Sequence, residues 1–80
     1  MFIGLFTEDG LDQVCTTQAQ ATRETRDLRA MGCRVNAYQA GKELALYAID
    51  DWIRDGISFA VARNRVEAGQ ILHAENNPAN

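Results

Sequence analysis

Few side chains in this sequence could take part in acid–base, nucleophilic or metal chemistry, and they lie far apart. His73 is the only histidine, and Cys15 and Cys33 are the only cysteines. These residues lack the spacing of a metal site, and no histidine stands close to a serine or cysteine nucleophile. The glycines stand singly, without the run that cradles a phosphate. We therefore expect a non-enzymatic protein without cofactor or metal, in which both cysteines are free thiols.

Carboxylates form the more informative pattern. Such groups usually make a solvated surface, but a cluster can also bind arginines or lysines of a partner, or present negative charge as phosphates do. The net charge of -3 favours a basic protein surface over nucleic acid or an anionic membrane. We predict that the partner-binding residues are Glu8, Asp9, Asp12, Asp50, Asp51 and Asp55.

Length and composition predict one small globular domain spanning residues 1–80, with a frayed tail at residues 76–80. The chain has 80 residues, of which 46% are hydrophobic and 24% charged, a mixture typical of folded domains. The apolar start, residues 1–6, is too short for a membrane span and lacks the basic residues of a signal peptide. We therefore expect a cytoplasmic protein that does not enter the membrane.

The start of the chain predicts a β-hairpin. Residues 2–7 are rich in aromatic and β-branched side chains, and residues 11–15 would form the return strand. Asp9-Gly10 between them is typical of a type I′ turn, in which both central residues need positive φ. The register would pair Leu5 with Val14 and Thr7 with Asp12.

A helix and a third strand should follow the hairpin. Thr17 and Gln20 fit a capping box at the start of this helix, and Gly32 fits the position just after its end. Its apolar stripe would consist of Ala21, Leu28 and Met31. Residues 33–38 would form the strand, which would place the two cysteines at opposite ends of the sheet, too far apart to bridge.

The second half of the chain predicts helices. Residues 42–55 carry a broad apolar face at helical spacing, on which Trp52 should be buried against the sheet. The alternative is a strand at residues 44–49, which would give a ferredoxin-like order. In the first part of residues 57–72 large apolar side chains alternate with smaller ones, as they do in a strand. Ser58, however, is a good N-cap, so we predict a third helix. The expected fold is α+β, with an antiparallel three-stranded sheet covered by helices on one face.

Residues 56–65, Gly-Ile-Ser-Phe-Ala-Val-Ala-Arg-Asn-Arg, resemble the turn and second helix of helix-turn-helix DNA-binding proteins. That resemblance implies that Arg63, Asn64 and Arg65 contact bases or phosphates. The sequence departs from the pattern at Trp52, where such proteins usually have a small residue.

The pattern as a whole favours a non-enzymatic protein-binding module. Its size and acidity are similar to those of phage and mobile-element accessory proteins, including anti-CRISPR inhibitors that occupy a basic surface of a host nucleic-acid-binding complex. The alternative is a small helix-turn-helix regulator that uses residues 56–72. A third interpretation is a minor enzyme subunit or a homodimeric structural protein.

Overall fold

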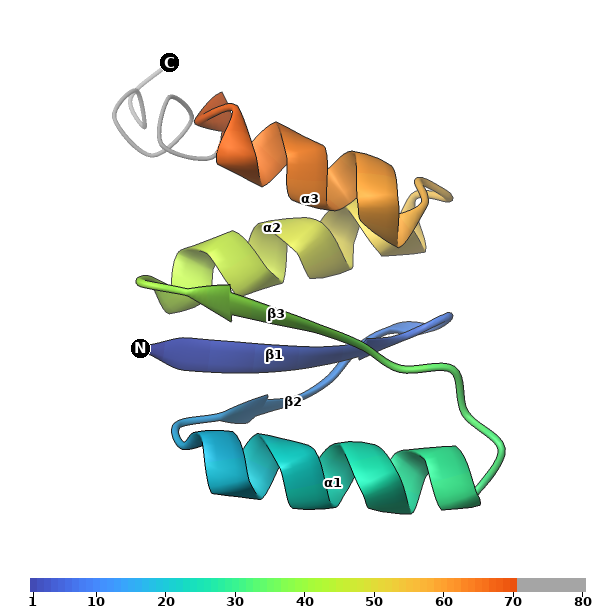
Figure 1. Cartoon of the computed structure of the whole chain (residues 1–80). Helices are drawn as coiled ribbons and strands as arrows, with labels where there is room; N and C mark the ends of the chain where they lie inside the picture. Colours follow the sequence, from blue (N-terminus) through green and yellow to red (C-terminus); the bar gives the residue numbers. More distant parts are fainter. Residues whose placement is uncertain (71–80) are drawn as a thin grey trace.

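The computed structural model describes residues 1–70, which form three strands and three helices (Figure 1). The predicted α+β class with an N-terminal hairpin is confirmed. The predicted tail at residues 76–80 and His73 lie outside the described residues. In chain order the elements are β1 (Phe2–Thr7), β2 (Gly10–Cys15), α1 (Gln18–Ala30), β3 (Asn36–Ala40), α2 (Glu43–Arg54) and α3 (Phe59–Glu67).

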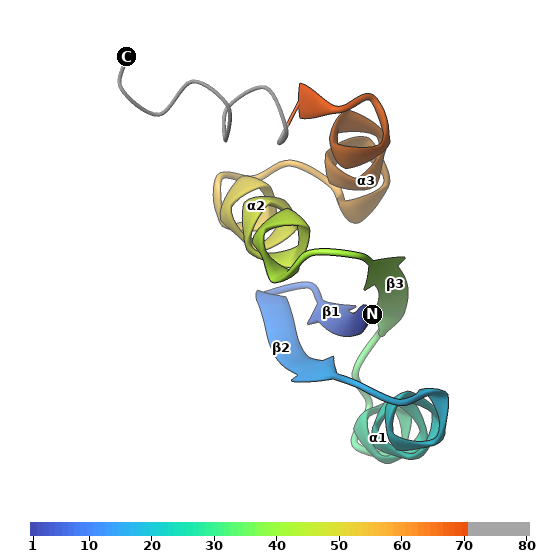
Figure 2. The ribbon, with the colours of Figure 1, turned by 90° about the vertical axis from the view of Figure 1, so that its left-hand side faces the viewer.

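The sheet is antiparallel, and β1 is its central strand in the order β2-β1-β3. Both of its faces are covered, by α1 on one side and by α2 and α3 on the other (Figures 1 and 2). The prediction that helices cover only one face was therefore wrong. The reason lies in β1, whose residues 3–6 are all buried, because the strand supplies apolar side chains to both faces.

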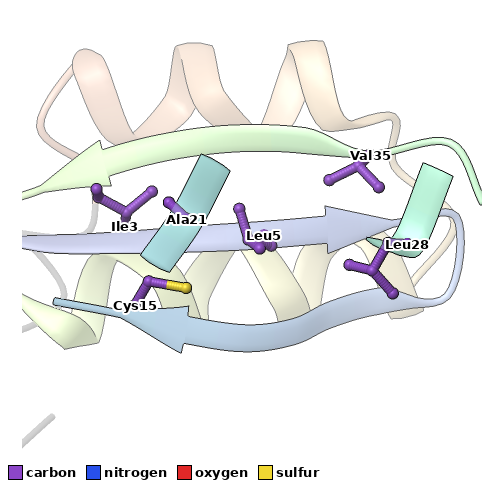
Figure 3. Close-up of a cluster of buried hydrophobic side chains, with 6 residues drawn as sticks. All are labelled: Ile3, Leu5, Cys15, Ala21, Leu28 and Val35. Atoms are coloured by element: carbon purple, nitrogen blue, oxygen red, sulfur yellow. The ribbon is translucent and has the colours of Figure 1, made fainter. Parts of the chain in front are cut away.

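The core on the α1 side is small. Ile3 and Leu5 of β1 pack there with Cys15 at the end of β2. Ala21 and Leu28 project from α1 toward them, and Val35 adds a side chain from the segment before β3 (Figure 3). Two of the three predicted apolar positions of α1 are thus buried. The third, Met31, is 73% exposed, because it caps the C-terminus of the helix, where the chain turns away from the sheet.

The core on the other face is larger and holds Phe6, Leu46, Ile49 and Ala62. The rings of Phe6 and Phe59 are 5.4 Å apart, so α3 reaches the sheet as well as α2. Half-buried side chains surround this core, among them Leu11, Val14, Tyr38, Trp52, Ile53, Ile57 and Val66.

The hairpin register differs from the predicted one. Thr7 pairs with Gly10, and Glu8 and Asp9 form the two-residue turn. Of these residues only Gly10 has positive φ, at 115°, so the turn is not the predicted type I′. A bulge between Leu5 and Phe6 then shifts the register, and the strands pair Leu5 with Gln13 and Gly4 with Val14. This shift directs Val14 to the α2 side, whereas the predicted pairing would have placed it beside Leu5 on the α1 side.

The predicted glycine cap at the end of α1 is confirmed, and the capping box at its start is half formed, because the Gln20 side chain accepts from the Thr16 N–H rather than from the Thr17 N–H. The Thr17 hydroxyl accepts a hydrogen bond from the Gln20 backbone N–H at 3.2 Å. Gly32, at φ 90°, donates to the Arg29 carbonyl, and Cys33 donates to the Leu28 carbonyl, the two bonds of a Schellman motif. The third strand begins at Asn36, three residues later than predicted.

Residues 43–67 form two helices, so the predicted third helix is confirmed over Phe59–Glu67, and the alternative strand at residues 44–49 is wrong. Ser58 caps α3 by accepting from the Val61 N–H at 3.4 Å. On the apolar face of α2, Leu46 and Ile49 are fully buried, whereas Leu44 is exposed. Trp52 is half-buried, and its ring lies under the Arg65 guanidinium at 5.4 Å.

Candidate protein-binding surface

Asp50 connects the two predicted acidic groups. Its Oδ1 accepts a hydrogen bond from the backbone N–H of Leu11 at 2.7 Å. The same carboxylate pairs with Arg54 one turn later on α2, at 3.1 Å. Its side chain is only 19% exposed, so Asp50 positions α2 beside the hairpin and has little surface left for a partner.

A glycine is required next to this contact. Gly10 is buried and has positive φ, a backbone conformation that residues other than glycine rarely adopt. A Cβ atom built at this position would overlap the Asp50 carboxylate. The close approach of hairpin and helix thus depends on both residues.

The hairpin carboxylates are exposed. Glu8 forms a 3.8 Å ion pair with Arg34, and both side chains lie largely in solvent, where such a pair contributes little to stability. Asp9 is the second residue of the turn, and Asp12 lies at the bulge in β2. No ion pair joins Asp9 or Asp12 to another of residues 1–70.

The remaining predicted carboxylates lie on α2. Asp51 is on the solvent side of this helix, and Asp55 caps its C-terminus. Both are exposed, and neither forms an ion pair within the described part of the chain. We refer to Asp9, Asp12, Asp51 and Asp55 as the carboxylate surface.

These four residues belong to neighbouring elements. Figure 2 shows α2 on the same side of the molecule as β2, with α3 on the other side above β3. In Figure 1 the β1–β2 turn and the C-terminal end of α2 lie at the same end of the fold. The two groups, which are about forty residues apart in sequence, therefore supply negative charge to one region of the surface.

A shallow groove of ≈ 470 Å³ opens at the same end of the fold. One wall contains Thr7, Glu8 and Arg34, and the other contains the end of α2 and the turn before α3. Ile57 and Phe59 contribute half-buried apolar surface. The lining of the groove is mixed, with apolar surface from Ile57 and Phe59 and polar surface that includes the carboxylate of Glu8, a mixture that protein interfaces share.

The sequence did not predict this groove. Glu8 was selected for its charge alone, and no binding role was predicted for Ile57 or Phe59. The hairpin and the α2–α3 turn are too far apart in sequence for any local pattern to reveal their contact. Glu43 was also missed as an exposed carboxylate of α2. It accepts a hydrogen bond from the Tyr47 hydroxyl at 2.5 Å, and the four-residue spacing of this pair could have revealed it.

The residues of the predicted DNA-binding helix lie on α3, but their surroundings are not those of a free basic surface. Arg65 lies over the Trp52 ring. Arg63 pairs with Glu67 at 3.9 Å and stands 6.0 Å from the Phe59 ring. Asn64 is exposed.

The arrangement of α2 and α3 also differs from that of a helix-turn-helix. The two helices lie side by side and run in opposite directions (Figures 1 and 2), whereas the helices of that motif cross at about 90–120°. The turn between them closes with a Schellman motif, since Ile57 donates to the Trp52 carbonyl and Gly56 donates to the Ile53 carbonyl, each at 2.9 Å. Residues 43–67 thus form an antiparallel helical hairpin.

The thiols and phenols of the described residues show no arrangement for catalysis. Burial, together with the nearby Glu24, raises the pKa of the Cys15 thiol, which makes it a poor nucleophile. Burial and Glu67 likewise raise the pKa of Tyr38. Cys15 and Cys33 are both free thiols in the structure. Within residues 1–70, no three histidine, cysteine, aspartate or glutamate side chains are placed to hold one metal ion.

Comparisons with known proteins found no family model, curated protein or solved structure that matches this chain. The helices described in residues 1–70 all lack the length and apolar character needed to cross a bilayer.

Proposed function

We propose that this chain is a non-enzymatic protein-binding module whose carboxylate surface binds a basic surface of a partner protein. The observation that supports this proposal is the contact between Asp50 and the Leu11 N–H. It holds two acidic segments next to each other while leaving Asp9, Asp12, Asp51 and Asp55 exposed and without an ion pair in the described residues.

The physical role of these carboxylates would be mainly to steer the encounter and fix the orientation of the complex. Complementary charge at the rim raises the association rate more than it raises affinity. Affinity would come from the adjacent groove, where Ile57 and Phe59 can receive an apolar or arginine side chain of the partner. The partner we propose is a nucleic-acid-binding protein, because such proteins carry basic surfaces that carboxylates can occupy.

This mode of binding suits an accessory inhibitor from a phage or mobile element, such as an anti-CRISPR protein that acts in the cytoplasm of its host. The proposal rests on charge, size and surface geometry.

The test is affinity capture from bacterial lysate, with the proteins quantified by mass spectrometry. The bait is compared with a variant in which Asp9, Asp12, Asp51 and Asp55 are each replaced by asparagine. We expect basic nucleic-acid-binding proteins to be retained by the native chain, and their affinity for the variant to fall at least about tenfold, or about 1.4 kcal/mol. Capture should also weaken as salt is raised.

A control variant removes two negative charges elsewhere on the surface. Asp27→Asn with Glu67→Gln changes exposed carboxylates on α1 and α3, both of which have arginine partners. This variant should retain the partner. If it loses the partner as completely as the carboxylate-surface variant does, the effect is one of net charge, and the proposed surface is wrong.

A further inference from the structure

The two edges of the sheet are protected differently. At the β2 edge, the bulge interrupts the regular strand, and the Leu11 N–H already donates a hydrogen bond to the Asp50 carboxylate. Both features hinder the addition of another strand. The β3 edge has neither. Asn36–Ala40 pairs with β1 without interruption and contains no proline or lysine. Within residues 1–70, no hydrogen bond reaches the outward N–H and C=O groups of β3.

A groove lies between α1 and this open edge, which it meets at Ala37. Helix α1 packs mainly over β1 and β2, so the α1-facing side of β3 is left uncovered, and Ala37 and Gln39 are exposed there. The space between α1 and Ala37 has a volume of ≈ 440 Å³. Its other lining residues, mostly small or cationic, are Gln18, Ala21, Thr22, Thr25, Arg26 and Arg29.

The groove is cationic, although the chain as a whole is acidic. Arg26 and Arg29 line it, and no carboxylate does. One nitrogen of Arg29 donates to the Val35 carbonyl at 3.5 Å, which holds the guanidinium at the start of β3 and leaves its other donors available. The pair of Arg26 with Asp27 is 3.8 Å long and exposed, so a partner's carboxylate can compete for this arginine.

We propose that the β3 edge binds an extended acidic segment of a partner protein as a fourth strand of the sheet. The outward N–H and C=O groups of β3 would supply the main-chain hydrogen bonds of such a complex. Small side chains of the segment would enter the groove at Ala37, and carboxylates at one end would pair with Arg26 and Arg29. This surface is opposite in charge to the carboxylate surface and lies at the other edge of the sheet, so the inference does not depend on the proposed function.

The charge of the groove favours this occupant over a second copy of the chain. In a symmetric dimer β3 would pair with β3, and this strand contains no carboxylate to bind the arginines. It also favours a peptide over nucleic acid, because phosphates would contact the arginines without using the open N–H and C=O groups of the strand.

The test uses capped synthetic peptides of alternating valine and threonine that carry a pair of glutamates at the amino or the carboxyl end. Binding is followed by amide chemical shifts of the full chain in NMR spectra and by isothermal titration calorimetry. We expect one of these peptides to shift the amides of Ala37 and Gln39, and the matching peptide with lysines to bind at least about tenfold more weakly.

Variants of the chain assign the contacts. Arg26→Gln and Arg29→Gln should each weaken binding of the glutamate peptide several-fold, whereas Arg23→Gln, on α1 but outside the groove, should not. Ala37→Glu should abolish binding, because it fills the groove and repels the glutamates. Circular dichroism checks the fold of each variant, and of Arg29→Gln above all. The variant lacking the carboxylate surface should bind the peptide normally, which separates this proposal from the proposed function.

Several results would overturn the inference. One is the absence of β3 amide shifts with either glutamate peptide, and another is equal binding of the lysine peptide. Light scattering that shows a dimer, broken by Ala37→Glu, would assign the edge to a second copy. Binding of duplex DNA that requires Arg26 and Arg29 but leaves the β3 amides unshifted would assign the arginines to nucleic acid.

Discussion

Replacement of Asp50 by alanine should destabilise the protein far more than replacement of its neighbour Asp51. Asp50 accepts a 2.7 Å hydrogen bond from the Leu11 N–H and pairs with Arg54, whereas Asp51 is exposed and has no ion pair within residues 1–70. A hydrogen bond to a charged group contributes about 1.5–3 kcal/mol, and an exposed pair one turn apart adds about 0.3–0.5 kcal/mol. We therefore expect Asp50→Ala to lower the free energy of unfolding by about 2–3 kcal/mol.

The comparison with Asp51→Ala isolates this contact. Both changes replace aspartate by alanine inside α2, so the gain in helix propensity is similar and cancels. Asp51→Ala should change stability by no more than about 0.5 kcal/mol. Asp50→Asn keeps an oxygen that can accept from the Leu11 N–H but loses the charge, so its effect should be intermediate.

The assay is urea unfolding, followed by the fluorescence of Trp52 and by far-UV circular dichroism. For a domain of this size, the loss expected for Asp50→Ala corresponds to a decrease in Tm on the order of 10–20 °C. If Asp50→Ala and Asp51→Ala unfold at the same urea concentration, Asp50 does not hold α2 to the hairpin. The contact between Asp50 and Leu11 then does not keep the two acidic segments of the carboxylate surface together.

Other substitutions test the packing and the thiols. Gly10→Ala should cost at least about 2 kcal/mol, since it combines a strained positive φ with an overlap at α2, and thermal melts measure it. Trp52→Ala should cost about 2–3 kcal/mol, less than the roughly 3–5 kcal/mol of a fully buried aromatic residue, and an unchanged Tm would place this ring outside the core. In the native protein a thiol reagent should label Cys33 before Cys15, as peptide mass mapping can show. Burial raises the pKa of Cys15, so the unfolded chain binds fewer protons above about pH 8.5 and stability should fall as pH rises further. Cys15→Ala should reduce that fall.

Local signals in the sequence predicted the elements well. The Thr17 cap, the glycines after α1 and α2, and the Ser58 cap each satisfy backbone groups at a helix end, and such chemistry depends only on neighbouring residues. The apolar run of β1 predicted a strand for the same reason. The error was to assign that run to one covered face, although a strand buried on both sides reads as continuous rather than alternating.

Non-local packing explains what the sequence did not reveal. The turn was predicted at Asp9-Gly10, but the bulge between Leu5 and Phe6 shifts the pairing so that Val14 faces α2, and no local pattern specifies such a shift. The acidic groups were found by their composition. That Asp50 binds the hairpin while Asp51 is exposed follows from where α2 packs, which the chain order alone does not determine.

The most direct test of the carboxylate surface is a titration of the captured partner with four forms of the chain at low and at physiological salt. The forms are the native chain, the Asp9, Asp12, Asp51 and Asp55 to asparagine variant, the Asp27→Asn with Glu67→Gln control, and a variant with Arg63 and Arg65 replaced by glutamine. We predict that the carboxylate-surface variant alone binds at least about tenfold more weakly, and that its remaining binding depends less on salt. The central claim is contradicted if the carboxylate-surface variant binds as the native chain does. It is equally contradicted if the arginine variant is the one that loses the partner, a result that would support the DNA-binding interpretation of α3.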